Sequence, residues 1–183
     1  MAAQVTHSHH QSQPKPKWRL PPENYVKINF NGAVFPSANK SGIGVVIRNN
    51  RGLVIASCSL VLHQEFNSNK IEAMAATKAL SFAAELGLSD AVLEGDSIVI
   101  IKALEEEYNL LSPIGPLIAD AKFNSCFFTH LLYSHTKREC NSVAHGLARF
   151  AVNILDFLVW MEDVPPQFHS ILQADLSSYF NKT

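Results

Sequence analysis

The sequence predicts an α/β domain built on a mixed five-stranded sheet, with three antiparallel strands first, parallel strands after them, and flanking helices. Two observations predict it. Three strand-like stretches follow one another over residues 25–62, and helical and strand-like stretches then alternate up to residue 153. Consecutive strands with short connections form an antiparallel meander, whereas strands separated by a crossover helix pair in parallel.

Length and composition agree with one such domain. The chain has 183 residues, of which 47% are hydrophobic, so a single core needs no disulfide to hold it. It carries 15 basic and 16 acidic side chains, with a net charge of -1. This balance excludes a protein that holds nucleic acid mainly by bulk positive charge. A nucleic-acid function would therefore depend on local contacts.

The cysteine pattern and the hydropathy bear on the compartment. The three cysteines are far apart and lack CxxC spacing, which favours neither a disulfide framework nor a zinc site. We therefore expect a reducing, intracellular compartment, with nuclear and cytoplasmic locations left open. No apolar run approaches the length of a membrane span, and the N-terminus lacks the apolar stretch of a signal peptide. We expect no membrane partner and a monomer.

The two ends of the chain differ in composition from its middle. Residues 1–22 are rich in Gln, His, Pro and Lys and are predicted to form a flexible leader. The middle of the chain, residues 23–153, is the predicted domain. Residues 154–183 are predicted to form a C-terminal extension, with an apolar start, a Pro165-Pro166 break and an amphipathic helix. No chemistry is assigned to this extension.

The first three strands are expected at residues 25–35, 42–50 and 53–62, with turn-forming residues between the last two. In the first strand, apolar and polar side chains alternate from residue 26 to residue 31. Because successive side chains of a strand point to opposite faces, Asn29 and Asn31 share the polar face. Asn31 is expected at the end of its strand.

The remaining elements follow in the order helix, strand, helix, helix, strand, helix. An Ala-rich helix over residues 68–87 is predicted to be capped by Ser68 or Asn69 and stopped by Gly87. A short buried strand is then expected over residues 91–96, helices over 97–108 and 114–123, a strand over 126–135 and a last helix over 141–153.

Several polar residues fall where such sheets bind ligands, at the carboxyl ends of strands and in the adjacent helices. They are Asn31, Glu72, Asp96, His135 and His145. Each alone has a structural explanation, as a helix cap, a dipole partner or a satisfied histidine. Glu94 lies on the same face of its strand as Asp96, and two like charges so close favour a cation, water or separation.

The order of these pieces resembles the ribonuclease H fold, and in particular the reverse-transcriptase-like ribonuclease H domain of plant retroelements. The resemblance spans roughly residues 18–153. The matching segments are YVKINFNGA, SGIGVVIRNNRGLVIA, NKIEAMAATKALSFAAELGL, AVLEGDSIVIIKAL and HTKRECNSVAHGLAR.

The resemblance implies a site of four acidic residues that hold two magnesium ions, with manganese as an alternative, and that hydrolyse the RNA strand of an RNA–DNA hybrid. The four family positions fall on Asn31, Glu72, Asp96 and His145. Only two of them are acidic here, so these positions supply a charge of about -2 against a metal charge of about +4. We expect this deficit, above all at Asn31, to weaken metal binding.

The resemblance also implies substrate contacts. His135 matches a histidine that helps to protonate the leaving group or to release the product, a task that suits a pKa near neutrality. Asn69 and Asn141 match positions that touch the hybrid, although each is equally a good helix cap. The backbone of Gly32 is expected near the minor groove, where the 2′-hydroxyl distinguishes RNA from DNA.

Three functions therefore remain open at this point. The first is an RNA–DNA hybrid endoribonuclease of the ribonuclease H type, with activity weakened by Asn31. The alternative is a catalytically silent domain that binds nucleic acid or a protein through the same groove, and a third interpretation is an interaction module whose C-terminal helix docks a partner.

Overall fold

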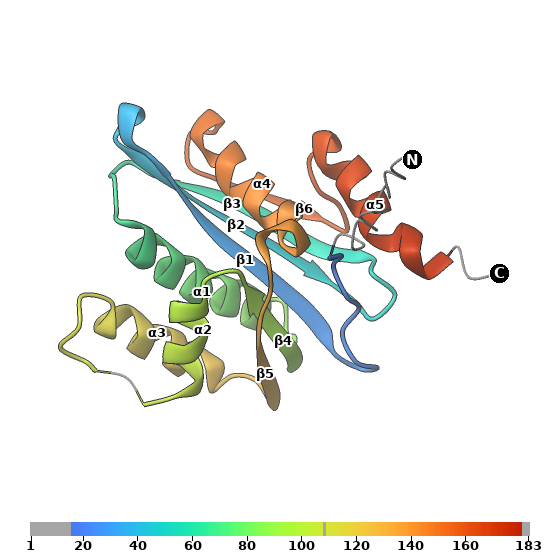
Figure 1. Ribbon diagram of the computed structural model, residues 1–183, viewed down its shortest axis with the longest axis horizontal. Coiled ribbons are helices and arrows are strands. Elements are labelled where there is room, and N and C mark those ends of the chain that lie inside the picture. Colours follow the sequence, from blue (N-terminus) through green and yellow to red (C-terminus); the bar gives the residue numbers. More distant parts are fainter. Residues whose placement is uncertain (1–15, 108, 181–183) are drawn as a thin grey trace, which may run out of the picture.

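A computed structural model describes residues 16–107 and 109–180 of the chain. One mixed sheet of six strands, in the order β5-β4-β1-β2-β3-β6, forms its centre, with helices on both faces (Figure 1). The strands are β1 (Val26–Phe35), β2 (Lys40–Arg48), β3 (Val54–Leu62), β4 (Asp90–Gly95), β5 (His130–His135) and β6 (Phe157–Met161). The predicted α/β class and mixed sheet are confirmed.

The first three strands form the predicted antiparallel meander, with β1 paired to β2 and β2 to β3. β1 ends at Phe35, as the predicted range 25–35 has it. Asn31 pairs with Gly44 of β2 in the middle of the ladder. The prediction that Asn31 ends its strand is therefore wrong, because the ladder with β2 continues beyond it to Phe35.

The parallel half of the sheet is also confirmed, since β4 pairs in parallel with both β1 and β5. The pairing of β4 with β1 stops at Asn29 and Glu94. Asn31 lies two residues beyond this last pair and level with the carboxyl end of β4. This termination, and not the end of β1, is what opens the edge at which the polar side chains gather.

The sheet has one strand more than predicted. β6 pairs antiparallel with β3, from Ala56 opposite Met161 to Leu60 opposite Phe157. Four of its five side chains are exposed, so the strand lacks the alternation of a half-buried strand. The start of the predicted C-terminal extension is thus an edge strand of the sheet itself.

The helices form two layers (Figure 1). In the figure α1, α2 and α3 lie on one side of the sheet and α4 and α5 on the other, and α4 packs on β1, β2 and β3. Their bounds are α1 (Ser68–Glu85), α2 (Ile98–Glu105), α3 (Gly115–Ser125), α4 (Ser142–Phe150) and α5 (His169–Phe180). No helix among the described residues is both long and apolar enough to cross a membrane.

The ends of several elements differ from the predicted ones. Asn67, and neither Ser68 nor Asn69, caps α1, because its side chain accepts a hydrogen bond from the backbone N–H of Lys70 at 2.9 Å. Gly87 follows the last turn with a φ of 74°, as a stop residue should. β5 begins at residue 130, since the backbone N–H of Phe128 still bonds to Ser125 and continues the turn after α3.

The close approach of α4 to the sheet depends on glycine. A Cβ atom on Gly44 would collide with the backbone of Ala144 and Ala148 in α4. Any side chain at position 44 would therefore push the helix away. Since Gly44 pairs with Asn31, the same close contact brings the first turns of α4 to Asn31.

The leader and the extension are both packed where the structure describes them. Trp18 has an exposed fraction of 0%, and the guanidinium carbon of Arg48 lies 3.6 Å from its ring centre. Arg48 in turn pairs with Asp175 of α5 at 2.7 Å. Packed chain thus begins before residue 22, the predicted end of the leader, while residues 1–15 and their histidines lie outside the described residues.

Candidate active site

Four predicted site residues meet at the edge where β4 ends. Asn31 comes from β1, Asp96 directly follows β4, Glu72 comes from the second turn of α1, and His145 from the first turns of α4. Asn31 is fully buried, and Glu72 is only 7% exposed. The crossover connections of the fold thus bring together residues that are up to 114 positions apart in the sequence.

The side chain of Asn31 connects the other three. Its amide nitrogen donates hydrogen bonds to Glu72 Oε1 at 2.9 Å and to Asp96 Oδ1 at 2.8 Å. Its amide oxygen lies 2.9 Å from His145 Nδ1. Since an amide oxygen can only accept, His145 Nδ1 donates in this arrangement. The prediction that these four positions form one cluster agrees with this geometry.

A fifth residue, Arg138, was not predicted to belong to the site. Its Nε donates to Asp96 Oδ2 at 3.1 Å, and its side chain is 70% exposed while that of Asp96 is 7% exposed. From the sequence alone, Lys137 and Arg138 are most simply a solvated loop after the last strand, with contact to a phosphate as the alternative. Its position next to Lys137, at the exit of a strand that ends level with Asp96, was the available signal.

The environment of Glu72 favours its protonated form. Burial raises the pKa of Glu72 to about 8, and the nearby Asp96 acts in the same direction. The backbone amide of Gly32 and the Arg138 guanidinium act in the opposite direction. One carboxyl oxygen, Oε2, is buried without a hydrogen-bond partner. An unpaired buried oxygen is costly, so it calls for a proton or a cation.

His145 is held in its neutral form. Burial lowers the pKa of His145, and the positive charge of Arg138 lowers it further, while Asp96 opposes both. A neutral imidazole has one donor nitrogen and one acceptor nitrogen. His145 thus adds no positive charge beside Glu72 and Asp96.

The donor atoms suit one divalent cation better than two. Among residues 16–107 and 109–180, no group of three or more His, Cys, Asp and Glu side chains is arranged to hold a metal ion. Two carboxylates do meet here, with the amide nitrogen of Asn31 between them and one Glu72 oxygen unpaired, while the amide oxygen of Asn31 faces His145. Carboxylate and amide oxygens are ligands for magnesium, so the site fits a single ion in its chemistry once the Asn31 amide turns its oxygen toward the carboxylates.

Glu94 does not add charge to this site. Its carboxylate is buried and bonds to Lys27 Nζ at 3.0 Å, to Asn29 Nδ2 at 3.0 Å and to Ser134 Oγ at 2.9 Å. The repulsion expected between Glu94 and Asp96 is therefore relieved by a buried lysine. Of the alternatives left open by the sequence, a cation, water or separation, the structure shows a cation at Glu94, and it is the ammonium group of Lys27 rather than a divalent ion.

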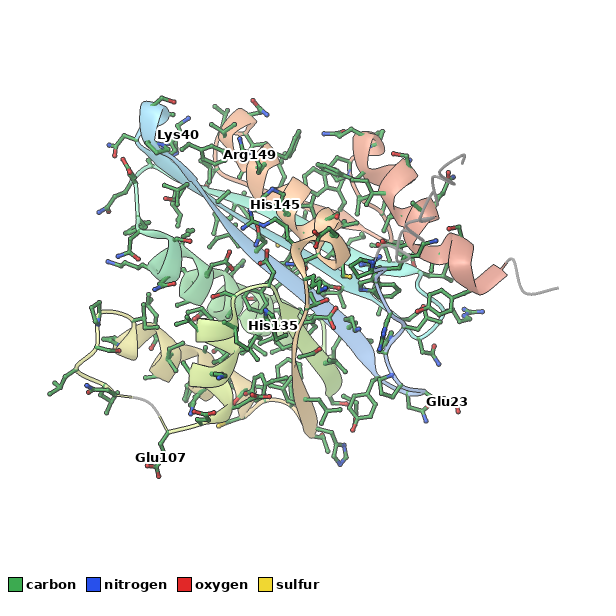
Figure 2. All side chains as sticks on the ribbon, viewed as in Figure 1. Glu23, Lys40, Glu107, His135, His145 and Arg149 are labelled. Carbon is green, nitrogen blue, oxygen red and sulfur yellow. The ribbon has the colours of Figure 1, made fainter. Side chains whose placement is uncertain are left out.

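The predicted substrate-contacting residues fall into two groups. His135 is exposed at the end of β5, opposite Gly95 and one residue from Asp96 in the register, and Asn69 is exposed in the first turn of α1. Figure 2 shows His135 and His145 on the same side of the molecule. Both exposed residues are available to a ligand.

Asn141 is not available to a ligand in this way, whereas Gly32 is half-buried. Asn141 is buried, donates to the backbone oxygen of Phe30 at 2.9 Å and accepts from Asn29 at 3.2 Å, without capping α4. Gly32 faces α1, where an added Cβ would lie 2.9 Å from the backbone of Ile71. Asn141 therefore anchors the start of α4 to β1, and its predicted hybrid contact is contradicted by its burial.

From the sequence alone, two further histidines have no obvious partner. In the structure, both have one. His130 Nδ1 lies 2.6 Å from Asp90 Oδ1, and His63 Nε2 lies 3.1 Å from the backbone oxygen of Leu155. Both are remote from Asn31 in the sheet, since Asp90 and His130 begin their strands. They take no part in the candidate site.

Solved structures share this fold. RNase H1 from the archaeon Halobacterium salinarum is 25% identical, with a TM-score of 0.65, and the match covers 70% of this chain and 98% of that chain. The N-terminal RNase H domain of a Mycobacterium tuberculosis protein is 21% identical, with a TM-score of 0.64, and the match covers 70% of this chain and 94% of that chain. LC11-RNase H1 in complex with an RNA/DNA hybrid is 24% identical, with a TM-score of 0.63, and the match covers 70% of this chain and 96% of that chain.

The sequence itself matches a family model. No curated protein is similar enough to count as a match. The model described as "Reverse transcriptase-like", however, matches residues 29–151, which is more than half of the chain and includes Asn31, Glu72, Asp96 and His145. With the ribonuclease H-like fold, this match shows that the chain belongs to the reverse-transcriptase-like family.

Proposed function

We propose that this domain binds RNA–DNA hybrids and hydrolyses their RNA strand as a ribonuclease H-type endonuclease, with its rate limited by Asn31. The observation that carries the proposal is the convergence of Asn31, Glu72, Asp96 and His145 at one edge of a ribonuclease H-like sheet. A structural neighbour was solved with an RNA/DNA hybrid, which supports hybrid as the substrate class.

Glu72 and Asp96 would hold a magnesium ion, or manganese in its place, and the imidazole of His145 would lie beside it. For its oxygen to join them as a ligand, the Asn31 amide would have to turn, because its nitrogen faces both carboxylates. A divalent ion in such a site stabilises negative charge on a phosphodiester and lowers the pKa of a bound water. The charge of about -2 from the two carboxylates suits one ion better than two. Glu72 must lose its proton to act as a ligand, which its raised pKa makes costly at neutral pH.

The chain's own residues would orient the substrate and move protons. His135 is exposed beside the end of β4, where it can give a proton to the leaving group. Arg138 extends from the buried Asp96 to the surface and offers positive charge toward a phosphate. Asn69, exposed one turn before Glu72, provides a neutral donor and acceptor to the hybrid.

The second candidate is a silent domain that binds hybrid without hydrolysis, and one observation favours it. The Asn31 amide nitrogen already bridges the two carboxylates that would hold the ion, and Arg138 neutralises Asp96 from outside. The protein thus stabilises this pair of carboxylates with its own donors. Hybrid binding is common to both candidates, so hydrolysis alone separates them.

The experiment is a cleavage assay on a labelled hybrid with magnesium and, in a second arm, with manganese. An Asp96→Ala variant is the control, because it removes one of the two carboxylates. We expect cleavage above this control, at a low rate. Cleavage equal to the control, with hybrid binding retained by fluorescence anisotropy, would leave the silent candidate. Loss of hybrid binding in the wild-type protein would refute both.

Three attributes remain proposals beside the function. The cysteines Cys58, Cys126 and Cys140 are free, which supports a reducing intracellular compartment. A monomeric state is proposed as well, and an origin in a plant retroelement is proposed on the resemblance of the sequence motifs. Sedimentation velocity checks the monomer, and localisation of a tagged full chain in cells checks the compartment.

A further inference from the structure

A polar cavity lies beside the candidate active site, between the start of the described chain and the end of β5. Its volume is about 420 Å³. It is separate from the Asn31 cluster, none of whose four residues lines it. The lining residues are Pro16, Lys17, Arg19, Leu20, Lys27, Glu94, Ser134, His135, Thr136, Lys137 and Cys140.

The cavity carries a surplus of positive charge. Its four Lys and Arg side chains face one acidic side chain, Glu94, which is already paired with Lys27 at 3.0 Å. Lys17, Arg19 and Lys137 are exposed. Within the described ranges, neither Arg19 nor Lys137 has an ion pair, and Lys17 bonds to the neutral hydroxyl of Ser177 at 3.3 Å. The charges of Arg19 and Lys137 thus remain unpaired, while Lys17 also lies within electrostatic reach of Asp175, in a chain whose net charge is -1.

The positive side chains of the leader are held in place. Trp18 Nε1 donates to Asn29 Oδ1 at 2.9 Å, and the buried Lys27 Nζ donates to the backbone oxygen of Arg19 at 2.7 Å. Tyr179 of α5 contacts the backbone on either side of Arg19, at Trp18 and Leu20. These contacts fix the backbone of residues 18–20, so the Arg19 side chain starts from a preorganised position.

The cavity and the candidate active site share one wall. His135, Thr136 and Lys137 line the cavity, while the next residue, Arg138, binds Asp96. The segment is anchored to β4 by the Thr136 backbone N–H, which donates to Gly95 at 3.0 Å. A polyanion bound at the Asn31 cluster therefore has a second positive region directly beside it.

We propose that this cavity binds a phosphate group of a nucleic-acid backbone. A phosphate offers several strong acceptor oxygens, which match the planar fork of Arg19, the ammonium groups of Lys17 and Lys137 and the hydroxyl of Thr136. The volume admits a phosphate with its attached sugar. The inference goes beyond the proposed function, because it concerns residues outside the Asn31 cluster and requires no hydrolysis.

The first experiment measures hybrid binding by fluorescence anisotropy over a series of salt concentrations, with EDTA present to prevent cleavage. The test protein is the full chain with Arg19→Gln and Lys137→Gln. The matched control is Lys102→Gln, which removes an exposed charge of α2 outside the cavity. We expect the double variant to bind roughly tenfold more weakly at low salt, and the slope of log affinity against log salt to fall by about 1 to 2. The control should change the affinity less than twofold.

The second experiment titrates inorganic phosphate into the free proteins and follows the backbone amide signals of residues 135–137 by NMR. The proposal is supported if the double variant binds both hybrid and phosphate more weakly, or binds hybrid alone more weakly. If phosphate binding is weakened and hybrid binding is unchanged, the cavity is a site for free phosphate compounds, and its assignment to a nucleic-acid backbone is refuted. If the double variant binds both probes as Lys102→Gln does, the cavity is not a phosphate site. Failure of wild-type hybrid binding with a retained phosphate response refutes the proposed function and the backbone source, while the cavity itself remains a phosphate site.

Discussion

Asn31 donates a hydrogen bond from its side-chain nitrogen to the carboxylate of Asp96 at 2.8 Å. The same nitrogen donates to Glu72, so a neutral side chain lies between two carboxylates. The resemblance to ribonuclease H implies an acidic residue at this position, and an acid there would need a cation beside it. Hydrogen bonding from Asn31 thus relieves part of the repulsion between Glu72 and Asp96.

Asn31→Asp should destabilise the metal-free protein. The substitution exchanges a donor for a third carboxylate within hydrogen-bond distance of Glu72 and Asp96. Loss of a buried donor to charged groups, with added repulsion, costs about 2–4 kcal/mol of unfolding free energy. Chemical denaturation in EDTA measures it, and magnesium should restore most of the loss in the variant but little in the wild type. Equal stability of both proteins in EDTA would contradict the described hydrogen bonding.

The stability of the wild-type protein should fall as the pH rises from about 4.5 to about 8. The pKa of Glu72 is raised to about 8 in the folded state, so over this range the folded chain binds more protons than the unfolded chain. The contribution is fully present below the unfolded pKa and is lost as the pH approaches 8, by a few kcal/mol. Denaturation midpoints across this range, compared with Glu72→Gln, measure it. A variant with the same pH slope as the wild type would exclude Glu72 as the cause.

Replacing either Arg48 or Asp175 alone should destabilise the protein much more than replacing both together. They form a buried ion pair at 2.7 Å that joins β2 to α5. Removing one partner leaves an uncompensated buried charge, so Arg48→Met or Asp175→Leu should each cost about 3–5 kcal/mol. The double variant Arg48→Met with Asp175→Leu should recover much of that loss. Urea denaturation of all four proteins gives the coupling, and additive losses would show that the pair is not coupled.

Much of the fold could be predicted because its signals are local. The meander follows from alternation within each strand, as at Asn29 and Asn31, and the parallel half follows from the helix over residues 68–85 between two strands. β6 escaped prediction because Phe157, Leu158 and Val159 are all partly exposed, which leaves no periodicity to detect. An apolar run of this length becomes a strand only through its pairing with β3.

The site was predictable in its members but not in its contacts. Glu72 and Asp96 carried the family motif, whereas the ion pair between Lys27 and Glu94 joins residues 67 positions apart and has no sequence signal. Asn141 illustrates the same limit. Its position before α4 suggested a cap or a hybrid contact, and only the tertiary structure shows that its amide bonds to Phe30 and Asn29.

The central claim is that Asn31 limits an otherwise assembled ribonuclease H-type site, and hydrolysis of a labelled RNA–DNA hybrid in magnesium by Asn31→Asp tests it most directly. We expect the variant to cleave at least about tenfold faster than the wild type, because a third carboxylate strengthens cation binding and transition-state charge stabilisation. Adding Asp96→Asn to the variant should abolish the gain. A folded, hybrid-binding Asn31→Asp protein that cleaves no faster than the wild type would contradict the claim.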